Sequence, residues 1–394
     1  MHGKSIGSLA GWPAREQEVR VGQRKIGLDY LRAAAILCVL IAHTAKETLL
    51  GSLGFIGVEI FFVLSGYLIG GILLSSYARH GEAPSWPMLR EFWVRRWLRT
   101  VPNYFLFLPA FMIADYYGLR RGLALYATFT QNLAWPIGNL FGISWSLTVE
   151  EWFYVLLPLL VALWYRVLGQ LKSALIATVL VLFFIPLFLK LTVCLGHPFD
   201  AGMRKVVVFR LDSLMWGVAL AMTQRYRPEI FRRLSSAFWV PVGLAGMALT
   251  LWWVWVRYRQ EHAFPATLGG VLVLSCASLA CALVLPYCSS IPWKRSVLNR
   301  CAYYVSVWSY SIYLSHDLII WKVGSRLGDP NLRNPLVIAI AWALTFAISA
   351  AVYYSFESPI LRWRDGMTGR RSRLIELTAA AACDGARSPL EIPN

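Results

Sequence analysis

The chain has 394 residues, of which 57% are hydrophobic and 15% charged, and its formal net charge is +17. This composition is too apolar for an ordinary soluble enzyme and indicates an integral membrane protein. Lysine and arginine gather in the polar gaps between apolar segments rather than on one soluble face, which argues against nucleic-acid binding. The seven cysteines form no C-x-x-C pair or other metal-ligand spacing, so we expect free thiols and no metal.

The chain begins with a polar, basic leader at 1–27, which we expect in the cytoplasm and which shows no cleavable signal peptide. Ten apolar segments follow, each long enough or nearly long enough to cross about 30 Å of hydrocarbon. Their approximate bounds are 28–46, 53–77, 101–117, 143–164, 173–190, 206–223, 236–256, 266–286, 303–321 and 335–356. We therefore predict an all-α transmembrane bundle at 28–364 and a disordered cytoplasmic tail at 365–394.

The charges between these segments predict the topology. With the N-terminus inside, the cytoplasmic connections hold 25 of the 38 lysines and arginines, and the opposite side holds 11. This asymmetry favours an even number of spans with both termini in the cytoplasm. The longest connection, at about 118–142, is too short for a separate domain, and we expect a short interfacial or re-entrant helix there.

The first apolar segment carries a polar stripe. Arg32 and His43 are eleven residues apart, close to three helical turns and about 16 Å, so their side chains lie on one face. Asp29 precedes Arg32 by three residues and can pair with it. His43 can take a proton from a hydroxyl group if a nearby carboxylate orients it, and the structural alternative is a helix-packing histidine.

A basic stretch, EFWVRRWLRT, precedes the third apolar segment and contains Arg95, Arg96 and Arg99. Arginine makes bidentate contacts with phosphate, and the neighbouring tryptophans can hold its guanidinium plane. Such a stretch also serves as an anchor for lipid headgroups. Glu59, in the second segment, adds another charged group at membrane depth.

The fourth segment begins with ISWSLTVEEWFYVLLPLL, which contains two adjacent glutamates. Glu150 and Glu151 lie about 100° apart on a helix, so only one faces a shared polar interior. We expect Glu150 to be that residue, because small polar residues flank it; the alternative is an interfacial glutamate at a helix start.

Three later segments hold further polar residues. Arg210 and Asp212 lie together in the sixth segment, where we expect them to neutralise each other and lower the cost of insertion. His316 lies in the ninth segment, and Glu357 lies at the inner end of the tenth. We interpret these four residues as supporting polar groups.

Taken in order, these blocks resemble the membrane acyltransferase-3 family, which includes O-antigen, exopolysaccharide, Nod-factor and macrolide O-acyltransferases. The matching blocks are LDYLRAAAILCVLIAH, GFIGVEIFFVLSGYLIG, FWVRRWLR, ISWSLTVEEWFYVLLP, FRLDSLMWGVALA, YSIYLSH and FESPI. The resemblance covers about residues 26–364. It implies a ten-helix bundle that transfers an acyl group, most often acetyl from acetyl-CoA, to a carbohydrate hydroxyl.

The resemblance also implies roles for individual residues. Arg32 and His43 match the family's arginine and histidine, and Glu150 matches the glutamate of its WSLxVE motif. Glu59 stands where the family usually has aspartate, and Trp152 stands where glutamine is common. Arg95, Arg96 and Arg99 fall in the cytoplasmic basic motif that is linked to acyl-CoA.

We therefore predict an O-acyltransferase of the bacterial cytoplasmic (inner) membrane. Its donor substrate would be acyl-CoA, most simply acetyl-CoA, and its acceptor a carbohydrate such as a lipopolysaccharide or exopolysaccharide unit, free or lipid-linked; no permanently bound cofactor is expected. The arginines would hold CoA phosphates. His43 would be the general base or a transient acyl carrier, oriented by Glu150 or Glu59.

Some members of the family carry a C-terminal, extracytoplasmic, esterase-like domain that completes the transfer. We expect this chain to act alone on its acceptor or to pass the group to a separate protein.

Two other functions fit the same polar residues. A transporter or flippase for a lipid-linked sugar or acyl compound also needs buried charge, and it would move its substrate without consuming CoA. A non-enzymatic partner in envelope glycan assembly would be insensitive to His43→Ala.

Overall fold

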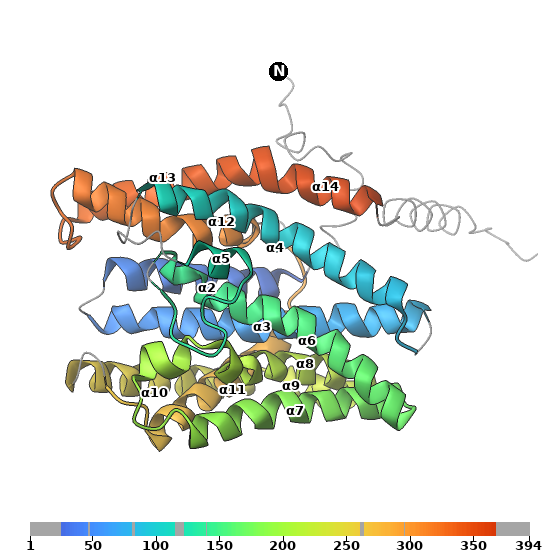
Figure 1. Cartoon of the computed structure of the whole chain (residues 1–394). Coiled ribbons are helices and arrows are strands. Elements are labelled where there is room, and N and C mark those ends of the chain that lie inside the picture. Colours follow the sequence, from blue (N-terminus) through green and yellow to red (C-terminus); the bar gives the residue numbers. More distant parts are fainter. Residues whose placement is uncertain are drawn as a thin grey trace, which may run out of the picture.

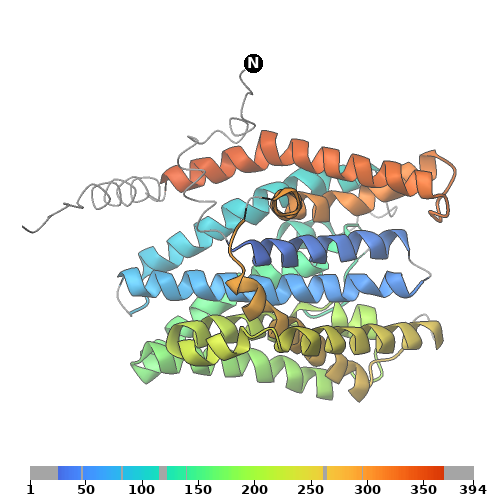
Figure 2. The same cartoon turned by 180° about the vertical axis from the view of Figure 1, so that it is seen from behind.

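The computed structural model describes residues 25–45, 48–80, 83–114, 122–138, 140–260, 264–294 and 296–367, and this part of the chain is helical, with two isolated β-bridges and no strand (Figure 1 and Figure 2). The long helices are α2 (Ile26–Thr44), α3 (Leu53–His80), α4 (Trp86–Ala114), α6 (Trp145–Leu168), α7 (Leu171–Thr192), α8 (Leu211–Tyr226), α10 (Trp239–Gln260), α11 (Leu268–Ser290), α12 (Val297–Arg326) and α13 (Pro335–Val352). The short elements are η2 (Leu49–Ser52), α5 (Leu123–Ala127), η3 (Gly142–Ser144), η4 (Phe199–Arg204), η5 (Val207–Phe209), α9 (Pro228–Leu234), η6 (Tyr353–Glu357) and α14 (Ser358–Met367).

Each of the ten predicted spans overlaps one long helix, although α4 begins at Trp86, well before the predicted start at 101. Seven helical segments of the described chain are long and apolar enough to cross a membrane, and they contain α2, α3, α6, α7, α10, α11 and α13. The other three long helices are α4, with its arginines, the shorter α8 and the polar α12. The protein is thus an all-helical, multi-pass membrane protein. The count of ten spans and the cytoplasmic location of the termini stay predictions.

Several helix starts follow sequence signals. The Ser296 side chain accepts a hydrogen bond from the Asn299 N–H at the start of α12. Asn334 caps α13 in the same way by accepting from the Leu336 N–H, and Pro335 occupies the first helical position. Serine and asparagine accept hydrogen bonds from backbone N–H groups that have no partner within the first turn of a helix. Proline has no backbone N–H, so it leaves no such group without a partner at this position.

Most of the long helices run along one common direction, and α4 crosses them obliquely (Figure 1 and Figure 2). α2 and α3 form the middle of the bundle, between a group with α4, α12 and α13 and a group with α7, α8, α10 and α11. α2 packs against α3, α11 and α12, and α3 also packs against α8 and α11. This arrangement places the α2 stripe at the centre of the molecule.

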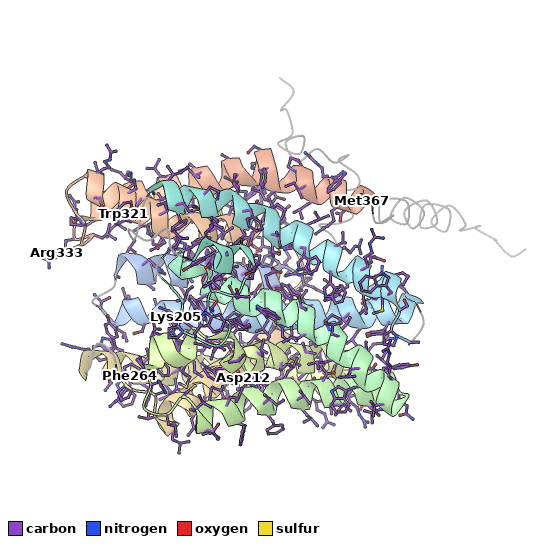
Figure 3. All side chains as sticks on the ribbon, viewed as in Figure 1. Lys205, Asp212, Phe264, Trp321, Arg333 and Met367 are labelled. Atoms are coloured by element: carbon purple, nitrogen blue, oxygen red, sulfur yellow. The ribbon has the colours of Figure 1, made fainter. Side chains whose placement is uncertain are left out.

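The connections predicted to face away from the cytoplasm meet at one end of the bundle. Figure 3 shows Lys205, Phe264, Trp321 and Arg333 at that end, and Met367 at the other. The helices therefore alternate in direction as the predicted topology requires.

Glycine allows α3 and α8 to approach closely. A Cβ atom at Gly66 would lie 1.9 Å from the Leu214 carbonyl oxygen, and one at Gly217 would lie 2.1 Å from the Val63 carbonyl oxygen. Small residues at such crossings let helix backbones touch inside a membrane.

The connection between α4 and α6 folds back into the bundle and includes the short helix α5. The Gln131 amide donates to Ser144 Oγ at 3.1 Å and to Thr148 Oγ1 at 2.6 Å, and the Asn132 amide donates to the Trp145 carbonyl at 3.1 Å. These buried amides hold the start of α6, which carries Glu150, against the rest of the bundle.

The ends of the predicted domain shift by a few residues. α2 begins at Ile26, and α14 continues to Met367, so the helical part extends slightly beyond the predicted 28–364. Residues 1–24 and 368–394, which include most of the predicted leader and tail, lie outside the described residues.

Candidate functional site

Arg32 and His43 lie on one continuous helix, α2, and both face α12. Arg32 Nη1 donates to Ser306 Oγ at 3.2 Å, and the His43 ring stands edge-on to the His316 ring with 4.6 Å between centroids. Because these partners are ten residues apart on α12, α2 and α12 run in the same direction, and the polar stripe occupies a single interface.

The predicted pair of Asp29 and Arg32 is present, with a serine between them. Asp29 Oδ1 is 4.0 Å from Arg32 Nη1, and it accepts a hydrogen bond of 2.7 Å from Ser306 Oγ. Asp29 is buried. Ser306 thus links the two charged groups to α12, a contact that spacing within α2 does not predict.

Both histidines have one ring nitrogen directed at a backbone carbonyl of their own helix. His43 Nδ1 is 2.8 Å from the Val39 oxygen, and His316 Nδ1 is 2.7 Å from the Tyr313 oxygen. A carbonyl oxygen only accepts hydrogen bonds, so Nδ1 carries the proton in each neutral ring. Nε2 is then the atom of each ring that can take a proton.

The sequence prediction that a carboxylate orients His43 requires a correction for Glu59. Glu59 is buried and forms an ion pair with Arg210, and its other oxygen accepts a hydrogen bond of 2.6 Å from Ser278 Oγ. These contacts join α3, α8 and α11. The Val39 carbonyl is the group seen to hold the His43 ring.

The predicted mutual neutralisation of Arg210 and Asp212 is also wrong. Arg210 pairs with Glu59, while Asp212 Oδ2 lies 2.5 Å from the Nζ atom of Lys190, which is fully buried on α7. Residues two apart on a helix do not face each other, and Arg210 precedes the first residue of α8. Sequence analysis assigned Lys190 no role, because a lysine at the end of an apolar segment usually extends to the membrane interface.

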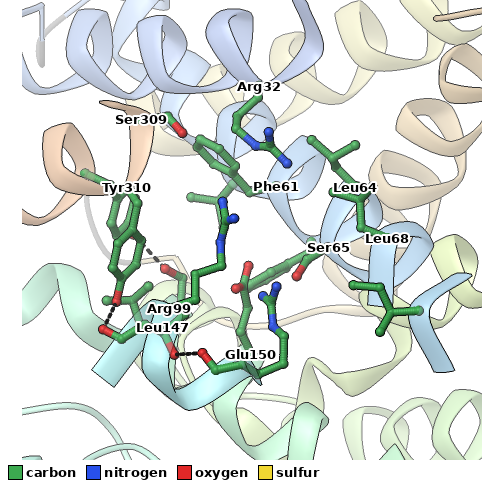
Figure 4. A pocket seen from close by; sticks show the side chains of 17 residues that line it. Arg32, Phe61, Leu64, Ser65, Leu68, Arg99, Leu147, Glu150, Ser309 and Tyr310 are labelled. Atoms are coloured by element: carbon green, nitrogen blue, oxygen red, sulfur yellow. Dashed lines mark hydrogen bonds between the residues drawn. The ribbon is translucent and has the colours of Figure 1, made fainter. Parts of the chain in front are cut away.

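A cavity of about 290 Å³ lies between α2, α3, α4, α6 and α12 (Figure 4). Its charged lining consists of Arg32, Arg96, Arg99 and Glu150. Figure 4 shows Arg32 and Arg99 extending into the same space, with Glu150 nearby. Among the lining side chains, three guanidinium groups face one carboxylate, and Asp29, the partner of Arg32, lies outside the lining. The lining itself thus carries an excess of positive charge, which favours an anionic ligand.

The cavity extends along α3 from Val58 to Ile72, about 21 Å of helix. α3 runs antiparallel to α2, because Gly54 lies against Ala42, whereas Gly57 lies against Ala35 and Cys38. Ile72 therefore lies at the end away from His43, and Val58 at the end toward it.

Glu150 belongs to a hydrogen-bonded chain at the cavity wall. The Tyr154 hydroxyl donates to Glu150 Oε2 at 2.6 Å and accepts from Arg96 Nη2 at 2.7 Å. Ser65 Oγ lies 2.6 Å from the same hydroxyl, and the Arg96 guanidinium lies 4.3 Å from the centre of the Tyr154 ring. Sequence analysis missed Tyr154, although its spacing of four residues from Glu150 places the two on one helix face.

Two neighbours of these residues lie outside the cavity lining. Glu151 is buried but does not line the cavity, so Glu150 is the glutamate that faces the shared interior, as predicted. Arg95, which was grouped with Arg96 and Arg99, does not line the cavity either, and its Nη1 atom is 3.3 Å from Glu91 Oε1 on the same helix.

Glu357 lies in η6 and joins three elements. Its Oε2 atom accepts from Asn103 Nδ2 at 2.8 Å and from Ser311 Oγ at 3.0 Å. These partners lie on α4 and α12, next to the cavity, so Glu357 supports the two helices that carry lining residues.

Tyr313 stands at the end of the cavity that is nearer to the histidines. Its ring is 5.7 Å from the His316 ring and 6.2 Å from the Phe61 ring, between centroids. Tyr313 and Phe61 line the cavity, whereas His43 and His316 are not among the described residues that do so. The lining of the cavity therefore ends at Tyr313 and Phe61, short of the histidines.

Comparison with known proteins decides the family. The family model described as "Acyltransferase domain" (Acyl_transf_3) matches residues 25–354. The chain belongs to the acyltransferase-3 family. The resemblance found in the sequence is thereby confirmed.

Three relatives of this acyltransferase-3 protein carry descriptive names. O-acetyltransferase OatA of Staphylococcus aureus is 29% identical over 364 residues, which cover 85% of this chain and 57% of the relative. The putative peptidoglycan O-acetyltransferase YrhL of Bacillus subtilis is 28% identical, with coverages of 85% and 54%. Peptidoglycan O-acetyltransferase OatA of Listeria monocytogenes is 26% identical, with coverages of 84% and 55%.

The chain spans a little over half the length of the curated relatives it matches. No solved structure matches it. Membership of the acyltransferase-3 family and the names of these relatives support the prediction that the protein is an O-acyltransferase enzyme. In the described ranges, no group of three or more His, Cys, Asp or Glu side chains is arranged to hold a metal ion.

Proposed function

We propose that this protein is a membrane O-acetyltransferase that moves an acetyl group from acetyl-CoA to a hydroxyl group of a cell-envelope glycan. The observation that carries the proposal is the cavity, which is lined by three arginines and lies between α2 and α12 beside a pair of histidines. The acceptor suggested by the relatives' names is peptidoglycan. A lipopolysaccharide or exopolysaccharide unit is the second candidate.

The cavity suits parts of the donor in its charge and in its apolar wall. CoA carries phosphate groups, and guanidinium groups bind phosphate through bidentate, charge-assisted hydrogen bonds. The apolar wall from α3, which includes Leu64 and Leu68, would contact the pantetheine arm. The Glu150–Tyr154–Arg96 chain would keep one guanidinium in place before the donor arrives.

The histidine pair supplies the base. His43 Nε2 would take the proton of the acceptor hydroxyl as its oxygen attacks the thioester carbonyl carbon. The new C–O bond forms, the C–S bond breaks, and CoA leaves as a thiolate that takes the proton back from the imidazolium. Alternatively, Nε2 attacks the thioester carbonyl carbon first, and CoA leaves as a thiolate. The acceptor hydroxyl then attacks the acetyl carbon and displaces the imidazole, and the hydroxyl proton passes to the thiolate. In both routes the Val39 carbonyl fixes the tautomer.

The proposal is tested by giving acetyl-CoA, labelled in the acetyl group, to membranes that contain the protein and a glycan acceptor. We expect label on the glycan with the wild type and a loss of about 10²- to 10⁴-fold with His43→Ala, the usual contribution of a general base. His197→Ala is the matched control, because His197 is exposed on a loop. Equal transfer by wild type and His43→Ala would remove the base assignment.

The acceptor is identified in the same membranes. Peptidoglycan fragments and lipopolysaccharide are supplied separately, and the labelled product is digested to find the acetylated sugar. Label on peptidoglycan alone supports the first acceptor, and label on lipopolysaccharide alone replaces it with the second. Movement of a lipid-linked sugar without any release of CoA would support a flippase instead.

A further inference from the structure

The donor cavity and the histidine pair are separate compartments in this structure. On α3 the lining ends at Val58, beside Gly57, which faces Cys38 of α2. His43 lies five residues beyond Cys38, so the cavity stops about 7 Å short of it along the helix. A reaction between the two compartments requires the wall between them to move.

That wall is aromatic. Tyr313 from α12 and Phe61 from α3 meet edge to face, with 6.2 Å between centroids and 77° between ring planes. Tyr313 is buried, and on its other side its ring is 5.7 Å from the His316 ring. Of the two aromatic residues, Tyr313 is thus the one that touches both compartments.

Two hydrogen bonds hold Tyr313 in the closed position. Its hydroxyl donates to the Ile143 carbonyl at 3.0 Å and lies 2.7 Å from Ser146 Oγ, which donates in return. Ile143 and Ser146 lie on either side of the junction between η3 and α6. These two bonds therefore attach the Tyr313 side chain to the start of α6, the helix that carries Glu150. The side chain can be released without breaking any backbone hydrogen bond within a helix.

We propose that Tyr313 is a positioning residue that separates the acetyl thioester from the histidines until the acceptor is present. This inference rests on the proposed function, in which acetyl-CoA occupies the cavity and His43 is the base. In the closed state, the wall keeps water that reaches His43 away from the thioester. Release of the hydroxyl from Ser146 and Ile143 lets the thioester carbonyl meet the imidazole and the acceptor oxygen.

The proposal predicts faster hydrolysis of acetyl-CoA when the hydrogen bonds of the Tyr313 hydroxyl are weakened. Without acceptor, water replaces the glycan hydroxyl: its oxygen forms a bond to the acetyl carbon, the C–S bond breaks, and acetate and CoA are released. The proton passes through the imidazole to the CoA thiolate. A more mobile Tyr313 side chain raises the rate of this hydrolysis relative to the rate of transfer. A damaged or unfolded protein lowers the rates of both reactions.

The test measures CoA release from acetyl-CoA without acceptor, and glycan acetylation with acceptor, for the same purified protein. Tyr313→Phe keeps the ring and loses both hydrogen bonds, and we expect its hydrolysis-to-transfer ratio to rise about tenfold. Ser146→Ala loses one bond, and a rise of about threefold is expected. The double variant His43→Ala/Tyr313→Phe should release no CoA, because hydrolysis passes through the imidazole.

The matched control is Tyr310→Phe. Tyr310 lines the same cavity one helical turn earlier, and its hydroxyl donates to the Thr100 carbonyl at 2.7 Å. Its hydrolysis-to-transfer ratio should stay at the wild-type value, because any change in donor binding alters both reactions alike. An equal rise in Tyr310→Phe, or no rise in Tyr313→Phe and Ser146→Ala, would overturn the proposal. If Tyr313→Phe does not fold, Ser146→Ala decides.

The two proposals fail in different ways. If the wild type transfers no acetyl group to any glycan, the proposed function fails and the wall has no donor to confine. If the wild type transfers acetyl groups, and Tyr313→Phe and Ser146→Ala hydrolyse acetyl-CoA no faster than the wild type, only the role of Tyr313 fails.

Discussion

Two regions of this protein carry buried charge, and they use it differently. Where α3, α7, α8 and α11 meet, each charge has one opposite partner: Glu59 pairs with Arg210, and Lys190 pairs with Asp212. All four side chains are buried. Among the residues that line the cavity, three guanidinium groups face one carboxylate, and Asp29 pairs with Arg32 from outside the lining. Balanced charge fixes helix packing, whereas an unbalanced cavity is suited to a ligand that brings the missing charge.

The cost of desolvation explains the difference. A buried charge without a partner is expensive, so a region with no ligand must supply both signs itself. A cavity can leave its positive charge in excess, because water solvates the guanidinium groups until an anion replaces it. Changes in the first region should therefore reduce stability, and changes in the second should reduce donor affinity.

The largest effect is expected from breaking a balanced pair. Lys190→Met leaves the Asp212 carboxylate buried without its cation, and we expect the free energy of unfolding to fall by about 3–5 kcal/mol. The double variant Lys190→Met/Asp212→Leu should recover most of this loss. Unfolding of the protein in detergent measures both. Equal stability of the single and double variants would mean that the pair is not coupled.

Removing one cavity arginine should act on the donor instead. Arg99→Gln takes away a charged phosphate contact worth about 1.5–3 kcal/mol, so KM for acetyl-CoA should rise about 10- to 100-fold with little change in unfolding. Arg95→Gln is the control on the same helix, because Arg95 does not line the cavity. A similar rise in KM for both variants would indicate a general surface attraction rather than a site.

A smaller effect is expected at Tyr154, which holds Glu150 and Arg96 without contacting the donor. Tyr154→Phe loses one hydroxyl, worth about 0.5–1.5 kcal/mol, so KM should rise a few-fold and kcat should change less. Tyr165→Phe, farther along α6, tests whether any tyrosine hydroxyl on this helix has the same effect. An unchanged KM in Tyr154→Phe would show that Arg96 keeps its position without the tyrosine.

The smallest effect lies in the turn between α12 and α13, outside both regions. The backbone N–H groups of Arg333 and Asn334 bond to the Asp329 carboxylate and lower its pKa below the ordinary value of 3.8. A lowered pKa contributes stability that is present above pH 3.8 and is lost as the pH falls through the lowered value. Asp329→Asn should thus unfold at a slightly lower temperature than wild type near pH 7, and the gap should narrow below pH 4. A gap that does not vary with pH would contradict this.

Sequence spacing predicted what lies within one helix. The all-helical architecture follows from the length of the apolar segments. The shared face of Arg32 and His43, the pairing of Asp29 with Arg32 and the orientation of Glu150 follow from helical periodicity. Family resemblance predicted which blocks belong together, and the family match confirms it.

Contacts between distant segments could not be predicted in this way. Glu59 and Arg210 are 151 residues apart, and only the close crossing of α3 and α8 shows that they meet. The wall at Tyr313 depends on the packing of α3, α6 and α12, which no local pattern contains. Proximity in sequence suggested a wrong pairing for Arg210 and Asp212, because their side chains contact different helices. Arg210 pairs with Glu59 on α3, and Asp212 pairs with Lys190 on α7.

The central claim is that the cavity arginines bind the CoA end of the donor. Its most direct test is equilibrium binding of labelled acetyl-CoA to purified protein that carries Arg32→Gln, Arg96→Gln and Arg99→Gln together. We expect this triple variant to remain folded and to lose binding, while Lys190→Met/Asp212→Leu binds as the wild type does. Wild-type affinity in the folded triple variant would show that the donor binds elsewhere.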